Sequence, residues 1–531
     1  MRKIGMTVAV VVVLIGAVGY GLVSYGPPEI RTAINKVVQL VVPQADIRKS
    51  LDEAISQLPP GYTASYKAAQ YDVVSDTVTL AGVTVHTPDG LDLSAEQIDV
   101  IKPSKDVTAG WSQARANPAQ VPQDKALPIA GAIIVKGFKG HGANFEGSVD
   151  AARIEGLRLY PWALLHDGVP SWGEAMARAA TPAATGDLDK MMPLLRFEAA
   201  LLLGLGYDRY TADGMRATGR TVATPTMPAS DLTYDFRKMT AENADRGVAS
   251  GYSAEGLQIR VGLLVDLSLD RVALADLNVR KPLIRILESP NLAPEMLDGL
   301  AVGKVEYTGM TLRQNQGGPI PIGTLTISKI LFTGSVPVSG DLAFEGLKLS
   351  RAQLPDPKAQ EAFEKLGLET MTESFGFSYR WELDKKRMTV TDLRNKVDEL
   401  GATTVSIELA EMSPGIANMM QGQLAHAKLR YDDASAVERA LKAMAAENGT
   451  DVELLRKQMI DMIQMQGQAL GESPAIAEAV KELVAFLQAP KSLTIELAPS
   501  APVPFAVLGN ASKMPPPELV QLLGVSVSAN K

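Results

Sequence analysis

The chain of 531 residues contains no cysteine. This absence excludes disulfide bridges, thiolate metal sites and a cysteine nucleophile. It does not identify the compartment, because an oxidising environment permits disulfides without requiring them.

Histidine is almost as rare, with four residues in the whole chain. The sequence has no H-x-x-x-H or C-x-x-C pair, so we expect no zinc site. A lone histidine in a strand or loop is more often a surface or hydrogen-bonding residue than a ligand. We interpret all four in that way: His86, His141, His166 and His426.

The motifs of common enzyme classes are also missing. The nearest approach to G-x-S-x-G is GYSAEG from Gly251, whose spacing is wrong and which a hairpin turn explains better. No G-x-x-x-x-G-K-[ST] loop is present and no G-x-G-x-x-G follows a predicted strand, so the cradle for a nucleotide phosphate is lacking. The sequence predicts no catalytic residue, no cofactor and no metal, and a protein that is not an enzyme.

Positive charge does not predominate. The chain has 52 Lys and Arg against 60 Asp and Glu, a net charge of −8. Binding to nucleic acid requires clustered cations, and so does a body that lies flat on an anionic membrane. We expect neither. The content of 46% hydrophobic and 21% charged residues is typical of a globular protein.

An uncharged run of residues 4–25 follows Arg2 and Lys3. About twenty helical residues span roughly 30 Å, the thickness of the hydrocarbon core of a bilayer. The run is longer than the apolar region of a signal peptide and has no small-x-small cleavage site near its end, so an uncleaved anchor is favoured over a cleaved signal peptide. The predicted anchor residues are Ile4, Val10, Val13, Leu14, Val18, Leu22 and Tyr25.

Arg2 and Lys3 are the predicted topology charges, which keep the N-terminal tip in the cytoplasm by the positive-inside rule. The rest of the chain then lies on the far side, which in a bacterium is the periplasm. The predicted localisation is the bacterial inner membrane, with a single span and a periplasmic body.

Changes of periodicity divide the chain into four segments. Helical spacing ends at Pro59-Pro60-Gly61 and gives way to alternation of period two, and capped helices begin after Tyr431. The predicted segments are the cytoplasmic tip and anchor (1–25), a helical stalk (26–60), a β-rich body with helical insertions near 171–205 and 356–371 (61–430), and a helical cap with a final strand (431–531).

A loose self-similarity runs through the β-rich body. Each copy is an alternating strand that is broken by Gly, Asp or Lys, as in TLAGVTV from Thr79. We interpret the break as a short turn into a second strand, so that a long antiparallel sheet grows hairpin by hairpin. The spacing is too irregular for a strict solenoid. The six copies begin at Ser75, Gly147, Leu267, Gly323, Leu342 and Phe377.

The predicted fold class is therefore α+β: an N-terminal transmembrane helix, a long antiparallel β-sheet built of hairpins, helical insertions and a C-terminal helical cap. The insertion at 187–204 is apolar almost all round, so it must be buried or face another apolar surface. Asp433 is interpreted as the N-cap of a helix from Ala434, and not as half of an acidic site with Asp432.

Methionines are concentrated in the predicted cap. Flexible thioethers suit irregular core gaps and also promiscuous apolar surfaces. We interpret the stripe as core filler, because Ile460 and Ile463 lie beside it. Its members are Met444, Met459, Met462 and Met465.

The N-terminal anchor and the repeated strands resemble bacterial envelope proteins of the AsmA/TamB-like type and of the YdgA-like single-pass periplasmic type. The strands that carry the resemblance are DTVTLAGVTV from Asp76, ARIEGLRL from Ala152 and RVALADLNV from Arg271. The resemblance does not extend to the helical region from Tyr431. It implies a curved sheet with an apolar trough and a role in envelope homeostasis or phospholipid traffic, and it carries over no catalytic residue.

Three functions remain open on the sequence. The first is lipid handling, in which an uncovered apolar sheet face forms a groove for the acyl chains of a membrane lipid. A closed core between sheet and helices would argue against it. The second is a non-enzymatic scaffold that docks other envelope proteins through a sheet edge or the helical cap. The third is an envelope enzyme of unknown chemistry.

Overall fold

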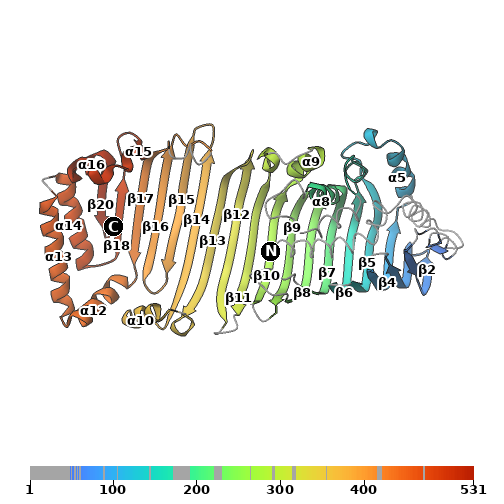
Figure 1. Ribbon diagram of the computed structural model, residues 1–531, viewed down its shortest axis with the longest axis horizontal. Coiled ribbons are helices and arrows are strands. Elements are labelled where there is room, and N and C mark those ends of the chain that lie inside the picture. Colours follow the sequence, from blue (N-terminus) through green and yellow to red (C-terminus); the bar gives the residue numbers. More distant parts are fainter. Residues whose placement is uncertain are drawn as a thin grey trace. The chain divides into compact units, whose positions relative to one another are not determined.

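In the computed structural model of the chain, twenty β-strands dominate the part that is described (Figure 1). The chain divides into two compact units, which we call unit 1 (residues 1–305 with 332–335) and unit 2 (residues 306–331 with 336–531). The structure describes residues 48, 51–52, 55–56, 58, 61–87, 90–104, 106–142, 145–170, 192–220, 230–262, 265–289, 294–313, 319–354, 356–414, 421–470 and 473–531.

Unit 1 is built on an antiparallel meander. Strands β3 to β10 each pair with the next one along the chain, and two short strands pair with opposite ends of β3. The strands are β1 (Thr63–Ser65), β2 (Ala68–Asp72), β3 (Thr77–His86), β4 (Asp92–Pro103), β5 (Leu127–Gly142), β6 (Phe145–Leu159), β7 (Leu205–Arg220), β8 (Asp231–Asp245), β9 (Val248–Val261) and β10 (Val265–Asn278). The helices are α5 (Val107–Ala116), η1 (Pro118–Gln120), α6 (Pro161–Leu164), α8 (Met192–Gly204), α9 (Arg280–Glu288) and η3 (Pro294–Leu297).

The two faces of this sheet differ in chemistry. One face is apolar and closed to solvent: Ala212 and Met239 are 0% exposed and Val149 is 1% exposed. The other face carries rows of charge in which neighbours on successive strands attract each other. In one such row Asp213, Lys238, Glu255 and Arg271 follow one another on β7 to β10 with alternating sign.

A first row of left-handed glycines crosses the sheet of unit 1. Gly82, Gly137, Gly214 and Gly256, in the odd-numbered strands β3 to β9, have φ between 59° and 63°. The register is unchanged on either side of each glycine, so the strands bend together without slipping. A charged side chain lies over each one, from Lys67 between β1 and β2 at Gly82 and from an adjacent strand at the other three. At Gly214 an added Cβ would approach Asp150 Oδ2 to 1.9 Å, so no other residue fits without displacement.

A second row occupies the even-numbered strands β4 to β10. In β6, Asp150 lies in the first row and Gly156, with φ 61°, in the second, six residues further on. Where a strand crosses one of these rows, the alternation of its side chains between the two faces of the sheet shifts by one residue. Apolar residues on either side of that point are therefore three residues apart, as are Val149 and Ala152. This spacing keeps the apolar side chains on one face through each bend. The left-handed residues of the second row are Lys102, Gly156, Asn243 and Asp276.

The predicted hairpin repeat is corrected by these rows. In five of the six copies the breaking residue lies inside one continuous strand and has a positive φ: Gly82, Gly156, Asp276, Lys329 and Gly346. The copy from Phe377 has its break at the hairpin between β14 and β15, and the copy from Gly323 continues through the turn between β12 and β13. A glycine between two alternating runs is compatible with a turn or with a bend, and the strand register decides between them.

The helices of unit 1 form further apolar clusters beside the sheet. Phe197 and Leu201 of α8 pack with Trp111 of α5, and Leu203 of α8 packs with Leu287 of α9. The described part of the apolar insertion is thus buried, apart from Leu202, which is 53% exposed. Residues 187–191 of the predicted insertion lie outside the described residues.

Unit 2 contains a second meander. Strands β13 to β18 pair in sequence order, β19 pairs with β17, and β20 pairs with β18. The strands are β13 (Val336–Ser350), β14 (Thr370–Glu382), β15 (Arg387–Val397), β16 (Gly401–Ala410), β17 (Gln423–Asp433), β18 (Ser492–Leu497), β19 (Val503–Pro504) and β20 (Val525–Ala529), and β11 (Ala301–Arg313) and β12 (Ile320–Thr333) contain residues of both units. The helices are η4 (Arg351–Gln353), α10 (Pro357–Lys365), α12 (Ala436–Asn448), α13 (Val452–Ala469), α14 (Pro474–Gln488), α15 (Phe505–Leu508), η5 (Ala511–Lys513) and α16 (Pro516–Leu523).

The last strand of unit 2 was not foreseen. The sequence predicts a final strand at 492–497, which is β18, but β20 adds five residues beyond it. Helix α14 lies beside β20 (Figure 1), and Glu482 of α14 accepts a hydrogen bond from the backbone N–H of Ala529 at 2.6 Å. Edge strands are commonly protected in this way, because their unpaired N–H groups otherwise recruit another strand.

The predicted transmembrane helix is corrected. Among the residues that the structure describes, no helix has both the length and the apolar composition needed to cross a membrane. The predicted anchor residues and topology charges, all within residues 1–25, lie outside the described residues. The structure therefore does not support the predicted transmembrane part of the fold class, and the predicted single-pass placement in the inner membrane is corrected with it.

Candidate functional site

The sheet of unit 2 presents two parallel rows of apolar side chains. In one row the register joins Gly340, Tyr379, Val390, Ile407, Ala427, Leu497 and Val525 across seven strands. The other row, two residues further along most strands, contains Leu342, Phe377, Leu393, Val405, Leu429, Ile495 and Val527. We call these two rows the open face.

The side chains of the open face are less buried than those of the apolar face in unit 1. Leu429 is 36% exposed, and Ile407 and Val405 on the neighbouring strand are half-buried. Val390 is the most buried of the named side chains, at 8% exposed. These exposures show that the open face is covered less completely than the apolar face of unit 1.

The aromatic residues of the open face lie at its β14 side. Phe377 and Tyr379 stack with their ring centroids 5.6 Å apart. The Tyr379 hydroxyl donates a hydrogen bond to the carbonyl oxygen of Pro337, and burial raises the pKa of Tyr379. Tyr431 of β17 lies on the same face, two residues beyond Leu429. Phe486 of α14 packs edge-on against it, with 6.2 Å between the ring centroids.

The apolar face of unit 1 contrasts with the open face. Burial raises the pKa of Tyr210, and it raises the pKa of Tyr252 to about 12. The hydroxyls of Tyr210 and Tyr234 are buried and have no hydrogen-bond partner in the described part of the chain. This face behaves as a closed apolar interior.

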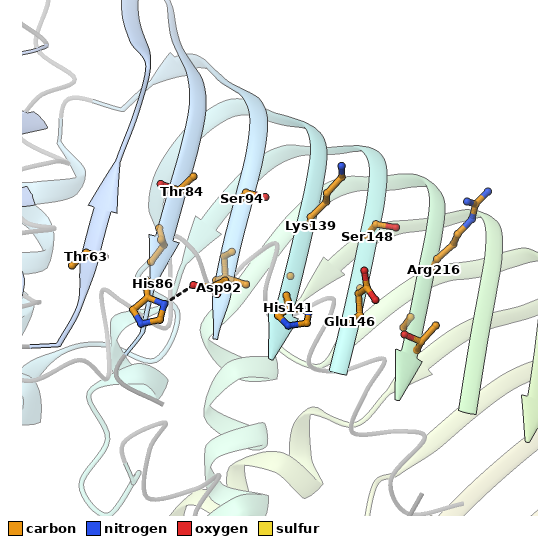
Figure 2. Close-up of a pocket in the computed structure, with 16 residues that line it drawn as sticks. Thr63, Thr84, His86, Asp92, Ser94, Lys139, His141, Glu146, Ser148 and Arg216 are labelled. Carbon is orange, nitrogen blue, oxygen red and sulfur yellow. Dashed lines mark hydrogen bonds and ion pairs between the residues drawn. The ribbon is translucent and has the colours of Figure 1, made fainter. Parts of the chain in front are cut away.

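A polar hollow of about 820 Å³ lies at one end of strands β1 and β3 to β7 (Figure 2). Two rows of polar side chains line it. The outer row joins His86, Asp92, His141, Glu146 and Thr218 on successive strands, and the inner row joins Thr84, Ser94, Lys139, Ser148 and Arg216. Residues that are far apart in the sequence meet here because the meander places the C-terminal ends of β3, β5 and β7 beside the N-terminal ends of β4 and β6.

Charges of opposite sign are separated between these two rows. In the outer row His86 Nδ1 contacts Asp92 Oδ1, and His141 lies opposite Glu146. The inner row holds the cations Lys139 and Arg216 on either side of Ser148, and Figure 2 shows both extending in the same direction. The nearest recorded carboxylate to Arg216 is that of Asp235, with 3.7 Å between Nε and Oδ1.

The predicted surface or hydrogen-bonding role of the histidines agrees with their surroundings. His426 Nε2 lies 2.8 Å from Glu496 Oε1, and His166 Nδ1 lies 2.9 Å from the carbonyl oxygen of Asp167. His86 pairs with Asp92, as described above. Within the described residues no group of three or more His, Asp and Glu side chains has the geometry to hold a metal ion.

The methionine stripe is divided between core and surface. Met459 packs against the cluster of Leu441, Ala445 and Leu455, as the core interpretation predicts. That interpretation is wrong for the other three methionines: Met444 is 41%, Met462 50% and Met465 70% exposed. Leu454 and Leu470 extend the exposed part along α13. We call Leu454, Met462, Met465 and Leu470 the α13 stripe.

The N-cap predicted at Asp433 is two residues too early. The N-cap residue of α12 is Ser435, but Asp433 Oδ1 accepts a hydrogen bond from the backbone N–H of Val437 at 3.0 Å. Tyr431 also donates its hydroxyl to Asp433, at 2.8 Å. These contacts give Asp433 a structural role, as the sequence predicts.

Comparison with known proteins gives a match in unit 2. A family model described as an uncharacterized protein matches residues 381–530, from the end of β14 through β20. The match includes five of the seven strands of the open face, together with the α13 stripe. A search of curated proteins finds no match to the chain.

Proposed function

We propose that this chain is a non-enzymatic binding protein that holds a long acyl chain against the open face of unit 2. The observation that carries the proposal is the seven-strand run of half-buried apolar side chains, with Ile407 and Val405 at its centre. Exposed apolar surface of this extent is unfavourable unless something covers it.

The dimensions of the open face suit an extended alkyl chain. Seven strands at about 4.8 Å each cover roughly 30 Å. Each methylene that is removed from water contributes about 0.8 kcal/mol, so a long chain gains much from such a surface without any hydrogen bond.

The polarity of the open face favours an alkyl chain over a protein partner. Protein interfaces contain about one hydrogen bond per 100–200 Å². The two rows of the open face carry no charged side chain, and the Tyr379 hydroxyl is already engaged with Pro337. An alkyl chain has no hydrogen-bonding groups, so none is left without a partner when the chain covers the open face.

A long-chain polyene fatty acid that fluoresces in apolar surroundings tests this proposal. We expect saturable binding to the purified full chain. Ile407→Lys should weaken binding about tenfold or more, because it places a charge in the row. Ser406→Lys is the matched control, since Ser406 points to the opposite face, and it should bind as the wild type does. Absence of saturable binding, or equal losses in both variants, would overturn the proposal.

A scaffold role is the second candidate, and the α13 stripe favours it. Met462 and Met465 are exposed further along α13 than Leu455 and Met459, which pack into the cap. Their neighbours Gln458 and Gln466 are uncharged, so the stripe fits the apolar face of a partner helix better than a charged surface. A stoichiometric helical partner that is lost in Met462→Ser/Met465→Ser but kept in Ile407→Lys would support this role. A partner kept in both variants would contradict it.

A further inference from the structure

The polar hollow of unit 1 has the composition of a second, independent ligand site. It lies on the charged face of the sheet and shares no residue with the open face. From its charges we infer that it binds a small organic phosphate, whose anionic group meets the inner row and whose hydroxyl groups meet the outer row.

The inner row supplies an anion site. Lys139 and Arg216 lie on β5 and β7, two strands apart, and Ser148 lies between them on β6. Strands are about 4.8 Å apart, so the two side chains start roughly 10 Å from each other and can converge on one group above the Ser148 hydroxyl. Figure 2 shows Lys139 and Arg216 on opposite sides of Ser148, with both side chains extending away from the outer row.

The two cations are available to a ligand. Among the described residues no carboxylate lies within ion-pair distance of Lys139. Arg216 is 74% exposed, and its 3.7 Å contact with Asp235 is longer than a hydrogen bond. A phosphate offers both cations the charge-assisted hydrogen bonds that they lack in this structure.

The outer row supplies acceptors for hydroxyl groups. Residues two apart along a strand are about 6.7 Å from each other, which is the distance from the phosphate position above Ser148 to Glu146. Asp92 lies two strands across on β4 as well as two residues along, so it is roughly 12 Å from that position. The Asp92 carboxylate has one oxygen on His86 and a side chain that is 60% exposed, so its second oxygen can accept a ligand hydroxyl. An organic phosphate with hydroxyl groups at its far end can bind to both the inner and the outer row. Inorganic phosphate can bind only to the inner row.

Titration calorimetry with glucose 6-phosphate, inorganic phosphate and glucose tests this assignment on the full chain. We expect saturable binding of glucose 6-phosphate, about tenfold or more tighter than that of inorganic phosphate, and no binding of glucose alone. Lys139→Gln and Arg216→Gln should each weaken glucose 6-phosphate binding about tenfold. Glu146→Gln should weaken glucose 6-phosphate but not inorganic phosphate.

Lys136→Gln is the matched control, because Lys136 lies on the same strand and face but does not line the hollow. It should bind as the wild type does, and equal unfolding temperatures should show that all variants are folded. The inference is overturned if neither phosphate binds saturably, if inorganic phosphate binds as tightly as glucose 6-phosphate, or if Lys139→Gln and Arg216→Gln lose no more affinity than Lys136→Gln.

Discussion

Single glycines set the bend of the sheet in unit 1. At Gly82, Gly137, Gly214 and Gly256 the backbone has a positive φ, and a charged side chain occupies the space where a Cβ would be. Both conditions select glycine, the first by backbone strain and the second by steric overlap. The bend therefore depends on residue identity at one position in each strand.

Gly214→Ala should destabilise unit 1. The new Cβ would lie 1.9 Å from Asp150 Oδ2 in a left-handed conformation, which we expect to cost about 1–3 kcal/mol. Gly251→Ala on β9 is the matched control, because no atom lies within 4 Å of its added Cβ and its φ is not in the left-handed range. Denaturant unfolding should show a lower midpoint for Gly214→Ala alone; equal midpoints would contradict the account of the bend.

Glu482 should make unit 2 sensitive to acid. Its hydrogen bond from the Ala529 N–H and the nearby Lys531 hold the pKa of Glu482 below the usual value. A carboxyl group whose pKa is lower in the folded protein than in the unfolded protein stabilises the fold at every pH above its unfolded pKa. This stabilisation is lost as the pH falls through the folded pKa. Between pH 5 and pH 2, roughly the range below the usual Glu pKa, the wild-type melting temperature should fall more steeply than that of Glu482→Gln. Glu478→Gln on the same helix should retain the wild-type slope, and parallel slopes in all three proteins would refute the role of Glu482.

Residue patterns in the sequence located these features only in part. The motif TLAGVTV marks Gly82 correctly as a special backbone position, but a turn and an in-strand bend require the same residue type. The polar hollow could not be predicted at all. His86 and His141 lie on either side of Asp92 in one row only because of the register of β3, β4 and β5, and a local pattern does not encode register between strands.

At the scale of elements, α13 shows how one helix divides between core and surface. Leu455 and Met459 face the cluster with Leu441, while Met462 and Met465 lie exposed further along the helix. The apolar spacing alone predicts a helix, and this prediction is confirmed. It does not say which apolar positions are covered, because the packing with α12 covers Leu455 and Met459 but not Met462 and Met465 further along α13.

Substitutions on α13 and α12 should separate the two kinds of apolar residue. Leu441→Ala removes a side chain that is 2% exposed and should cost about 2–5 kcal/mol. Met465→Ser changes a side chain that is 70% exposed and should alter stability by less than about 0.5 kcal/mol. Thermal unfolding compares the two variants, and a loss for Met465→Ser as large as that for Leu441→Ala would show that the α13 stripe is part of a core.

At the scale of the whole molecule, the two units differ in how far the apolar face of their antiparallel sheet is exposed. Unit 1 closes its apolar face, with Ala212 and Met239 at 0% exposure, whereas unit 2 leaves Leu429 and its neighbours accessible. The sequence predicts one long antiparallel sheet, and the family resemblance implies an apolar trough on it. It cannot say which face is covered, since covering depends on contacts between segments that are distant in the chain.

The absence of cysteine makes the accessibility of the open face directly measurable. A single introduced cysteine reacts with a thiol reagent at a rate that reports its exposure. Ile407→Cys probes the open face, Ser406→Cys the opposite face of the same strand, and Ala212→Cys the closed face of unit 1. We predict that Ile407→Cys reacts within about tenfold of the rate of Ser406→Cys and far faster than Ala212→Cys. A long-chain fatty acid should slow only Ile407→Cys, and a reaction of Ile407→Cys as slow as that of Ala212→Cys would contradict the claim that unit 2 presents an open apolar face.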